Sequence, residues 1–305
     1  MEKRWFYLGW IKGGYVLCFV IAEIGCNHKG SMDIVYKMIQ IATNYCNVDA
    51  VKFQKRTPKE LLTKEEYNML HPVNENSYGR TYGEHREFLE FNLNQHKQLK
   101  KWCEEMGVIY SSSVWDMTSA KEIASLNPEF IKIPSACNLK FDMLEYLCKS
   151  YNGKIQLSFG MTTKQEEKKI VDFFEKMGRN KDLIIYACTS GYPVDFEDVC
   201  LLEINRLKKL FGNKVDSIGF SGHHLGIAVD VVAYALGANY IERHFTLDRT
   251  WKGTDHAASL EPDGLRKLVR DLDGVKKALT YKSKDVLSVE NVQRKKLKRI
   301  SNALD

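Results

Sequence analysis

The sequence lacks the patterns that would assign it to several well-known classes of protein. None of its eight cysteines forms a Cys-x-x-Cys pair or has the spacing of a zinc site. Scattered cysteines of this kind are typical of free thiols in a reducing compartment, so we expect a cytoplasmic protein. No Gly-x-Gly-x-x-Gly motif follows an apolar run, which argues against a dinucleotide-binding doubly wound sheet.

Long uninterrupted apolar segments are also missing. The N-terminal stretch begins with charged residues and contains an apolar run, but Lys12 and the Gly13-Gly14 pair interrupt it. No Ala-x-Ala-like cleavage site precedes Cys26. We therefore predict no signal peptide, no membrane-spanning segment and no membrane partner.

The formal net charge of +6 is concentrated at the C-terminus. Residues 291–305 carry five basic side chains and one acidic one, a net of +4, so the other 290 residues carry only +2. No basic face with interleaved aromatic residues accompanies this run, so we predict no nucleic-acid partner. Residues 286–305 are interpreted as a basic linker or tail.

The remaining composition is that of an ordinary globular protein, and it contains eight short apolar runs. Hydrophobic residues make up 44% and charged residues 28% of the 305 residues, enough for a substantial core. The runs do not alternate strictly, which is typical of strands buried on both faces of a parallel sheet. They are residues 16–24, 48–54, 108–113, 129–134, 154–160, 183–189, 215–221 and 239–245.

Amphipathic segments with helical spacing alternate with these runs. They are residues 31–46, 93–106, 117–126, 139–150, 162–178, 195–211, 225–237 and 261–280. Eight strands alternating with eight helices predict an α/β protein with a (β/α)8 TIM barrel over residues 1–285, with a doubly wound sheet as the alternative. The long connection at 55–92 is predicted to be a functional or flexible loop.

Polar side chains end every one of the eight runs. In a (β/α)8 barrel the active site lies at the carboxyl ends of the strands, so these side chains should meet at one mouth. They include Glu23, Lys52, Gln54, Ser111, Ser112, Ser113, Lys132, Ser135, Ser158, Ser190, Tyr192, Ser221, His223, Glu242, Arg243 and His244. A single lysine or histidine in such a position is more often structural, so the prediction depends on all eight ends together.

The predicted mouth combines fixed cations with small hydroxyl groups. Lys52 and Lys132 supply the cations, and the hydroxyls come from Ser135, Ser158, Ser190 and Ser221. This combination suits a phosphate or a carboxylate.

Two histidines follow neighbouring strands of the predicted barrel. His223 and His244 could share one divalent metal ion, since imidazole binds Mn, Fe, Co and Zn and two protein ligands leave positions open for substrate. Glu23 could act as a base or orient a substrate hydroxyl.

Six motifs, taken together, resemble the sialic acid synthase (NeuB) family. They are IAEIGCNHKGS, AVKFQK, IKIPSACN, YACTSGYP, IGFSGHHLGI and IERHFTLDRTWKGTDHAASLEP, and the resemblance runs from about Ile21 to about Leu279. The last motif, with its Trp-Lys-Gly-Thr-Asp-His, resembles the animal N-acylneuraminate synthases. The resemblance implies a (β/α)8 barrel that condenses phosphoenolpyruvate with N-acetylmannosamine, its 6-phosphate or a related amino sugar. The implied products are a nine-carbon 2-keto-3-deoxy sugar acid and phosphate, and the implied cofactor is Mn²⁺, with Mg²⁺ or Co²⁺ possible.

The resemblance also implies roles for individual residues. Lys52, Lys132, Ser135 and Ser221 resemble the phosphoenolpyruvate site, His223 and His244 resemble the metal ligands, and Glu23, Gln54, Tyr192 and Asp255 resemble the residues around the sugar and its reacting carbon. We add Ser158, Ser190 and Arg243 to the predicted substrate-binding residues because they end predicted strands.

Three departures from the family pattern keep other interpretations open. Cys137 replaces the acidic residue that contacts the sugar in the family, and Ser190 stands where bacterial members have Asn. The family's small C-terminal antifreeze-like (SAF) domain, which reaches into the partner's site in a dimer, has no counterpart before Asp305. The alternatives are a pseudoenzyme or binding subunit that needs a separate SAF-domain partner, and a different metal-dependent barrel lyase. A homodimer is possible in each case.

Overall fold

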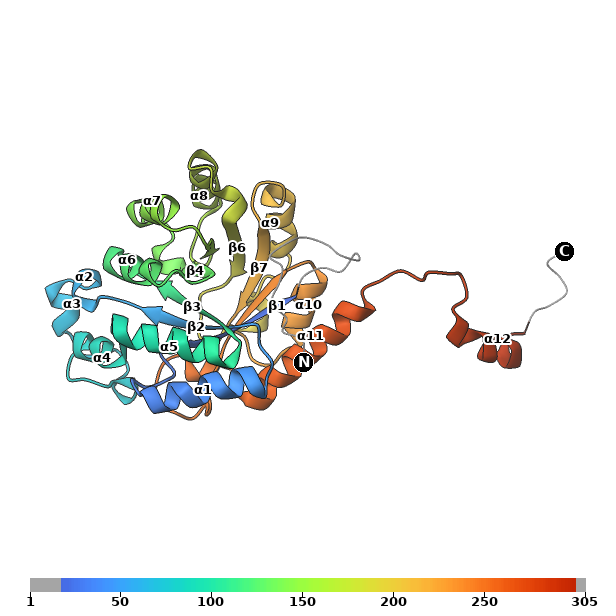
Figure 1. Cartoon of the computed structure of the whole chain (residues 1–305), viewed down its shortest axis with the longest axis horizontal. Coiled ribbons are helices and arrows are strands. Elements are labelled where there is room, and N and C mark those ends of the chain that lie inside the picture. Colours follow the sequence, from blue (N-terminus) through green and yellow to red (C-terminus); the bar gives the residue numbers. More distant parts are fainter. Residues whose placement is uncertain (1–17, 300–305) are drawn as a thin grey trace.

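Eight parallel strands form a closed barrel in the computed structural model, which describes residues 18–299 (Figure 1). The strands are β1 (Phe19–Gly25), β2 (Ala50–Lys55), β3 (Ile109–Val114), β4 (Phe130–Ile133), β5 (Lys154–Ser158), β6 (Leu183–Cys188), β7 (Ser217–Gly222) and β8 (Tyr240–His244). Strand β1 pairs with both β2 and β8, which closes the barrel. The predicted (β/α)8 fold is confirmed, and each predicted run overlaps one strand, four of which end one residue beyond the run. The start of the first run and the rest of the N-terminal stretch lie outside the described residues.

A helix that covers the outside of the barrel lies between each pair of successive strands and after β8. These helices are α1 (Met32–Asn44), α5 (Leu93–Met106), α6 (Met117–Ser125), α7 (Phe141–Ser150), α8 (Lys164–Lys176), α9 (Glu203–Phe211), α10 (Ala228–Ala235) and α11 (Pro262–Ala278). The helix predicted at 195–211 begins later in the structure than the sequence suggested. A short 3-10 turn, η4 (Phe196–Asp198), precedes α9, and Cys200 has a left-handed φ of 52° that a continuous α-helix cannot contain.

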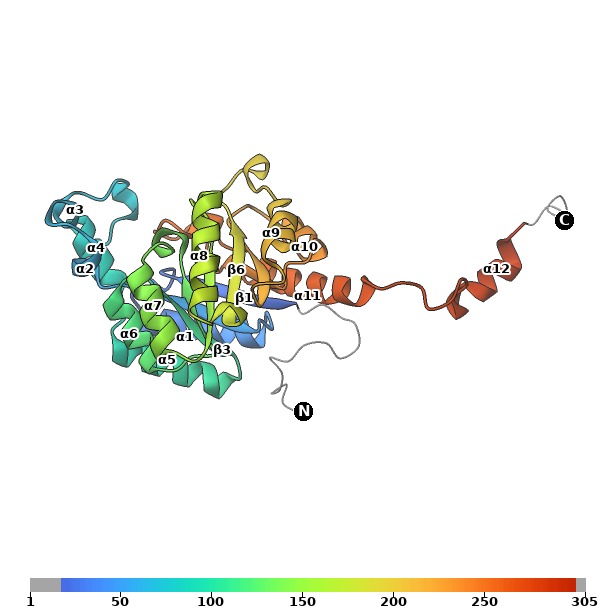
Figure 2. The same ribbon diagram turned by 90° about the horizontal axis from the view of Figure 1, so that it is seen from above.

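The long connection at 55–92 is folded rather than loose. It contains α2 (Pro58–Leu61), α3 (Lys64–Asn68), the turn η1 (Asn74–Asn76) and α4 (Tyr82–Leu89), and Figure 2 shows it standing out at one side of the barrel. Thr63 and Thr81 each begin a helix with a reciprocal capping box. Helices α3 and α4 pack tightly, because a Cβ added at Gly83 would lie 2.2 Å from the ring of Tyr67.

The hydrophobic core has two parts, and their positions determine where polar residues can gather. A large cluster lies between the strands and the helices, and a small cluster fills the inside of the barrel. The buried members of the inner cluster are Ile21, Ala50, Phe130, Ile184, Tyr186 and Tyr240. Most of these residues lie toward the amino ends of their strands, so the polar inward-facing residues are left at the carboxyl ends.

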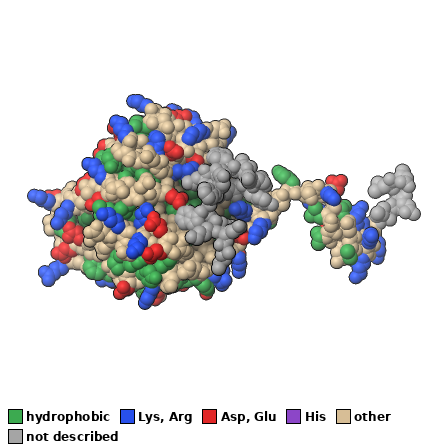
Figure 3. Space-filling view, viewed as in Figure 1, with side chains coloured by type: hydrophobic (Ala, Val, Ile, Leu, Met, Phe, Trp, Pro, Cys, Tyr) green, Lys and Arg blue, Asp and Glu red, His purple; other side chains and the backbone are tan. Residues whose placement is uncertain are grey.

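The chain beyond α11 leads away from the barrel (Figure 1). It forms the turn η6 (Ser288–Glu290) and helix α12 (Asn291–Leu297), whose last turn carries Arg294, Lys295 and Lys296. Figure 3 shows basic side chains on this segment, which is separated from the barrel surface. Within residues 18–299, no helix is long and apolar enough to cross a membrane. All eight cysteines are free.

Candidate functional site

Polar residues from all the predicted strand ends converge inside the barrel mouth. Successive side chains of a strand point to opposite faces, so every second residue of each strand faces inward. The register pairs Glu23 of β1 with Lys52 of β2 on one side and with His244 of β8 on the other. It also pairs Ser221 of β7 with Glu242 of β8. The predicted convergence of strand ends is therefore present in the structure.

Glu242 is the carboxylate at the centre of this mouth. It lies 3.2 Å from the Lys132 amine and 3.7 Å from the Lys52 amine, and it accepts a hydrogen bond of 3.0 Å from Ser221. Burial alone would raise the pKa of Glu242, but the charges of Lys132 and Lys52 hold it well below its usual range. Glu242 is thus an ionised counterion shared by both lysines.

Glu23 forms the second half of the same network. Its carboxylate makes an ion pair with Lys52 and accepts a hydrogen bond of 2.9 Å from Gln54, while Lys52 donates to Ser113 at 2.8 Å. Burial raises the pKa of Glu23 to about 7, against the opposing charge of Lys52 and together with the like charge of Glu242. A carboxyl with a pKa near neutrality is suited to accept or donate a proton.

His223 and His244 lie side by side, with ring centroids 5.4 Å apart. The Nδ1 atom of His223 is 2.9 Å from the carbonyl of Thr189, which orients the ring, whereas the buried Nδ1 of His244 has no hydrogen-bond partner among the described residues. Burial lowers the pKa of His244, so its imidazole is neutral and able to bind a metal ion.

These two imidazoles fit a metal site to which the protein supplies few ligands. In residues 18–299 no group of three or more His, Cys, Asp or Glu side chains is arranged to hold a metal ion. The orphaned nitrogen of His244 and the neighbouring ring of His223 fit a divalent ion whose other ligands are substrate and water.

Asp255 and Tyr192 lie over this pair of histidines. The Asp255 carboxylate is 4.0 Å from the Nδ1 of His244, and the Tyr192 ring lies 4.3 Å from the ring of His223. A Cβ added at Gly25 would lie 3.1 Å from Gln54, 3.3 Å from Glu23 and 3.7 Å from Asp255, so these three polar groups surround one point. The structure thus places together most of the residues predicted to surround the sugar.

The predicted serines form another side of the mouth. A Cβ added at Gly160 would lie 2.2 Å from the Ser190 hydroxyl and 2.7 Å from the Ser135 hydroxyl. Ser158 is buried at the end of β5, one strand along from Lys132. Cys188 ends β6 beside them, with its sulfur 3.9 Å from Ser135.

Arg243 does not belong to this group, so its predicted substrate-binding role is wrong. Its guanidinium makes a buried ion pair with Asp230 of α10 and donates to the carbonyls of His224 and Gly226. Because neighbouring residues of a strand face opposite ways, Glu242 and His244 point into the barrel and Arg243 points out toward the helices.

Cys137 also lies away from the mouth. Its side chain is buried in the outer core, with the sulfur 3.2 Å from the carbonyl of Trp115.

The sequence reasoning assigned no role to Glu242, Ser113 or Cys188. Glu242 and Ser113 were recognised as strand-end residues, and two-residue periodicity would have shown that Glu242 faces the same way as His244. No pattern in the sequence pointed to Cys188, because its position at the mouth follows from tertiary contacts with His223 and Ser135.

The chain is similar to known proteins in both sequence and fold. The family model of the NeuB family matches residues 38–284. The chain is 38% identical to N-acetylneuraminate-9-phosphate synthase of Homo sapiens over 288 residues, which are 94% of this chain and 78% of that protein. It is 33% identical to N,N'-diacetyllegionaminic acid synthase of Campylobacter jejuni, covering 91% of this chain and 83% of that one. The crystal structure of N-acetylneuraminic acid synthetase from Leptospira borgpetersenii in complex with citrate is similar, with a TM-score of 0.77, 27% identity and 93% of both chains covered.

Proposed function

Because the chain belongs to the NeuB family, we propose that it condenses phosphoenolpyruvate with an N-acylmannosamine-type sugar to a nine-carbon 2-keto-3-deoxy sugar acid and phosphate. The observation that carries this proposal is the buried pair of lysines that shares Glu242 at the mouth, next to Glu23 and two histidines. Relatives that share most of the chain are synthases of sugar acids of this kind.

Lys52 and Lys132 are the residues suited to hold phosphoenolpyruvate. Both amines are almost fully buried, and buried cations with fixed donors bind phosphate and carboxylate groups strongly. The Ser221 hydroxyl donates to Glu242, which both lysines contact, and Ser135 follows β4, the strand that carries Lys132. Phosphoenolpyruvate would bind at these lysines, which Glu242 and Glu23 neutralise in its absence.

His223 and His244 would hold a divalent ion, with Mn²⁺ preferred and Mg²⁺ or Co²⁺ as alternatives. When bound, such an ion supplies Lewis-acid polarisation of the aldehyde oxygen of the open-chain sugar. The unpaired nitrogen of His244 and the orientation of His223 by Thr189 support this assignment.

The protein residues then have separate tasks in forming the new carbon–carbon bond. The enol carbon of phosphoenolpyruvate attacks the aldehyde carbon, water adds at the neighbouring carbon, and phosphate leaves with cleavage of its bond to that carbon. Glu23, whose pKa lies near neutrality, would move the proton of the attacking water or of the new hydroxyl. Gln54, Asp255 and Tyr192 would hold the sugar over this point, and holding two substrates in line supplies much of the acceleration.

The test is phosphate release from phosphoenolpyruvate with Mn²⁺ over a panel of mannosamine-type sugars, with the product mass checked. Release that depends on one sugar, with the expected mass, supports the synthase. Release of phosphate without the sugar acid would indicate a different lyase. No release from folded, metal-loaded protein would favour the alternative, a pseudoenzyme or binding subunit that needs a separate SAF-domain partner.

A variant of Lys132 tests the anion-binding role. Lys132→Met should weaken the apparent affinity for phosphoenolpyruvate by about tenfold or more, because a hydrogen bond to a charged group contributes about 1.5–3 kcal/mol. The exposed Lys97→Met on α5 is the matched control and should change nothing. A Lys132→Met protein in which only the sugar's affinity changes would show that the anion role is wrong.

The eight free thiols support a reducing compartment, so we propose a cytoplasmic enzyme. A homodimer, which the family resemblance suggests, stays a prediction that size-exclusion chromatography with light scattering would check.

A further inference from the structure

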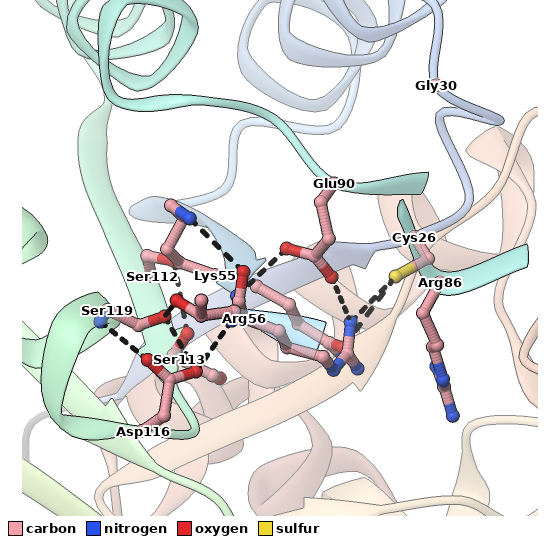
Figure 4. Close-up of polar contacts among 12 residues, drawn as sticks. Cys26, Gly30, Lys55, Arg56, Arg86, Glu90, Ser112, Ser113, Asp116 and Ser119 are labelled. Atoms are coloured by element: carbon pink, nitrogen blue, oxygen red, sulfur yellow. Dashed lines mark hydrogen bonds and ion pairs between the residues drawn. The ribbon is translucent and has the colours of Figure 1, made fainter. Parts of the chain in front are cut away.

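Arg56 is a buried arginine directly after β2, and its guanidinium donates to three side chains. One terminal nitrogen donates to the Glu90 carboxylate at 3.0 Å and to the Cys26 sulfur at 3.1 Å. The other terminal nitrogen donates to the amide oxygen of Gln54. Figure 4 shows the guanidinium between Glu90 and Cys26, with dashed lines to both. Because Glu90 directly follows α4, Arg56 joins the 55–92 connection to the mouth of the barrel.

The position of Arg56 is fixed through its backbone as well as its side chain. Its N–H donates to the Glu90 carboxylate at 2.8 Å, and the next N–H, that of Thr57, donates to the buried Asp116 carboxylate at 2.7 Å. The guanidinium also lies over the Trp115 ring, 4.3 Å from its centroid. These contacts leave the arginine little freedom to turn away from its partners.

A fixed arginine decides which way the Gln54 amide points. Arginine has donors only, whereas a glutamine amide carries an acceptor oxygen on one side and a donor nitrogen on the other. Since Arg56 can bond only to the oxygen, the nitrogen turns to the opposite side, where it donates to the Glu23 carboxylate at 2.9 Å. The flipped amide would set oxygen against carboxylate and donor against donor, and both contacts would be repulsive.

We propose that Arg56 is a positioning residue for the reaction, which orients the Glu23 carboxyl by fixing the Gln54 amide. The inference rests on the proposed function, in which Glu23 moves a proton and Gln54 holds the sugar. The amide nitrogen and the carboxylate meet beside Gly25, where an added Cβ would lie 3.1 Å from one and 3.3 Å from the other. A misplacement of about 1 Å at such a point can cost about a hundredfold in rate. The seating of Glu90 against Arg56 thereby links the 55–92 connection to the catalytic geometry.

The test is a double-mutant cycle of Arg56 and Gln54, which measures whether one residue acts through the other. The value of kcat/KM is measured with phosphoenolpyruvate, Mn²⁺ and the mannosamine-type sugar that the wild-type chain turns over best. Arg56→Met should lower it about tenfold in the wild-type background, the factor typical of a lost hydrogen bond to a charged group. In the Gln54→Ala background, where no amide is left to orient, the same change should cost less than about twofold.

Arg206→Met is the matched control for the loss of a buried ion pair. Arg206 of α9 makes two hydrogen bonds, of 2.8 Å and 2.7 Å, to the buried Glu167 carboxylate of α8, between the outer helices. This variant should change kcat/KM, if at all, by the same factor in both backgrounds. If Arg56→Met does not fold, Arg56→Met/Glu90→Gln replaces it, because that pair leaves no buried charge unpaired.

The outcomes separate this inference from the proposed function. No loss from Arg56→Met in the wild-type background, or an equal loss in both backgrounds, overturns the positioning role and leaves the synthase standing. If no sugar is turned over, the proposed function fails, and hydrogen exchange of the Gln54 side-chain amide by NMR decides, with its resonance identified by its absence in Gln54→Ala. Exchange about tenfold faster in Arg56→Met than in Arg206→Met supports the fixed amide, and equal exchange in the two variants overturns it.

Discussion

The carboxylate of Glu242 is the residue whose replacement should reveal the charge balance of the mouth. In Glu242→Gln the side chain keeps its volume and can still accept the hydrogen bond from Ser221, but its charge is lost. Lys132, with a side chain 2% exposed, then has no carboxylate left within ion-pair distance among the described residues, and Lys52 keeps Glu23.

The expected cost follows from burial. Removing one partner of a buried ion pair destabilises a protein by about 3–5 kcal/mol, and the retained volume of Gln places this variant near the lower end. Burial already lowers the pKa of Lys132 against the opposing charge of Glu242, so the variant lysine can lose its proton, which limits the cost. A loss of about 3 kcal/mol corresponds to a fall in Tm of roughly 6–12 °C for a large domain.

Urea unfolding at neutral pH measures this loss, provided that the slope with urea is unchanged. Glu145→Gln is the matched control, because Glu145 pairs with Lys149 on the exposed face of α7 and should cost less than about 0.5 kcal/mol. Phosphoenolpyruvate should stabilise Glu242→Gln strongly, since the ligand anion can replace the missing charge. A variant as stable as the wild type would refute the idea that Glu242 holds the two lysines.

Three further predictions concern single residues of the barrel. His244→Ala should bind less Mn²⁺ by elemental analysis and lose metal-stimulated turnover while its far-UV circular dichroism stays that of the barrel; unchanged activity would remove His244 from the metal site. The pKa of Glu23 is raised from 4.5 to about 7, so the folded chain holds a proton that the unfolded chain has lost between these values, and the contribution to stability falls as pH rises through this window. Glu23→Gln should therefore flatten the change of Tm between about pH 5 and about pH 7, and an unaltered slope would contradict the shift. Asp230→Asn should lower the unfolding free energy by about 3–5 kcal/mol, because Arg243 is left buried without its partner, whereas a raised KM at unchanged stability would restore the substrate role of Arg243.

The end of β8 follows one local pattern in the sequence and a different arrangement in space. Apolar periodicity and strand count predicted the barrel, because a strand covered on both faces must be apolar along its length. The run that predicted β8 contains three consecutive ionisable residues, Glu242, Arg243 and His244. All three were expected to lie together at the mouth of the barrel. Successive side chains of the strand point to opposite faces. Arg243 therefore points toward α10, whereas Glu242 and His244 point into the mouth.

The sequence by itself determined the order of strands and helices and the set of polar strand ends, because both follow from patterns within a few residues. Only the tertiary structure decided that Glu242 neutralises both lysines, that Cys137 lies in the core, and that Arg86 of α4 lies near Asp255. These relations join segments that are far apart in the chain. They depend on barrel closure and on the docking of the 55–92 segment, which no local pattern of residues specifies.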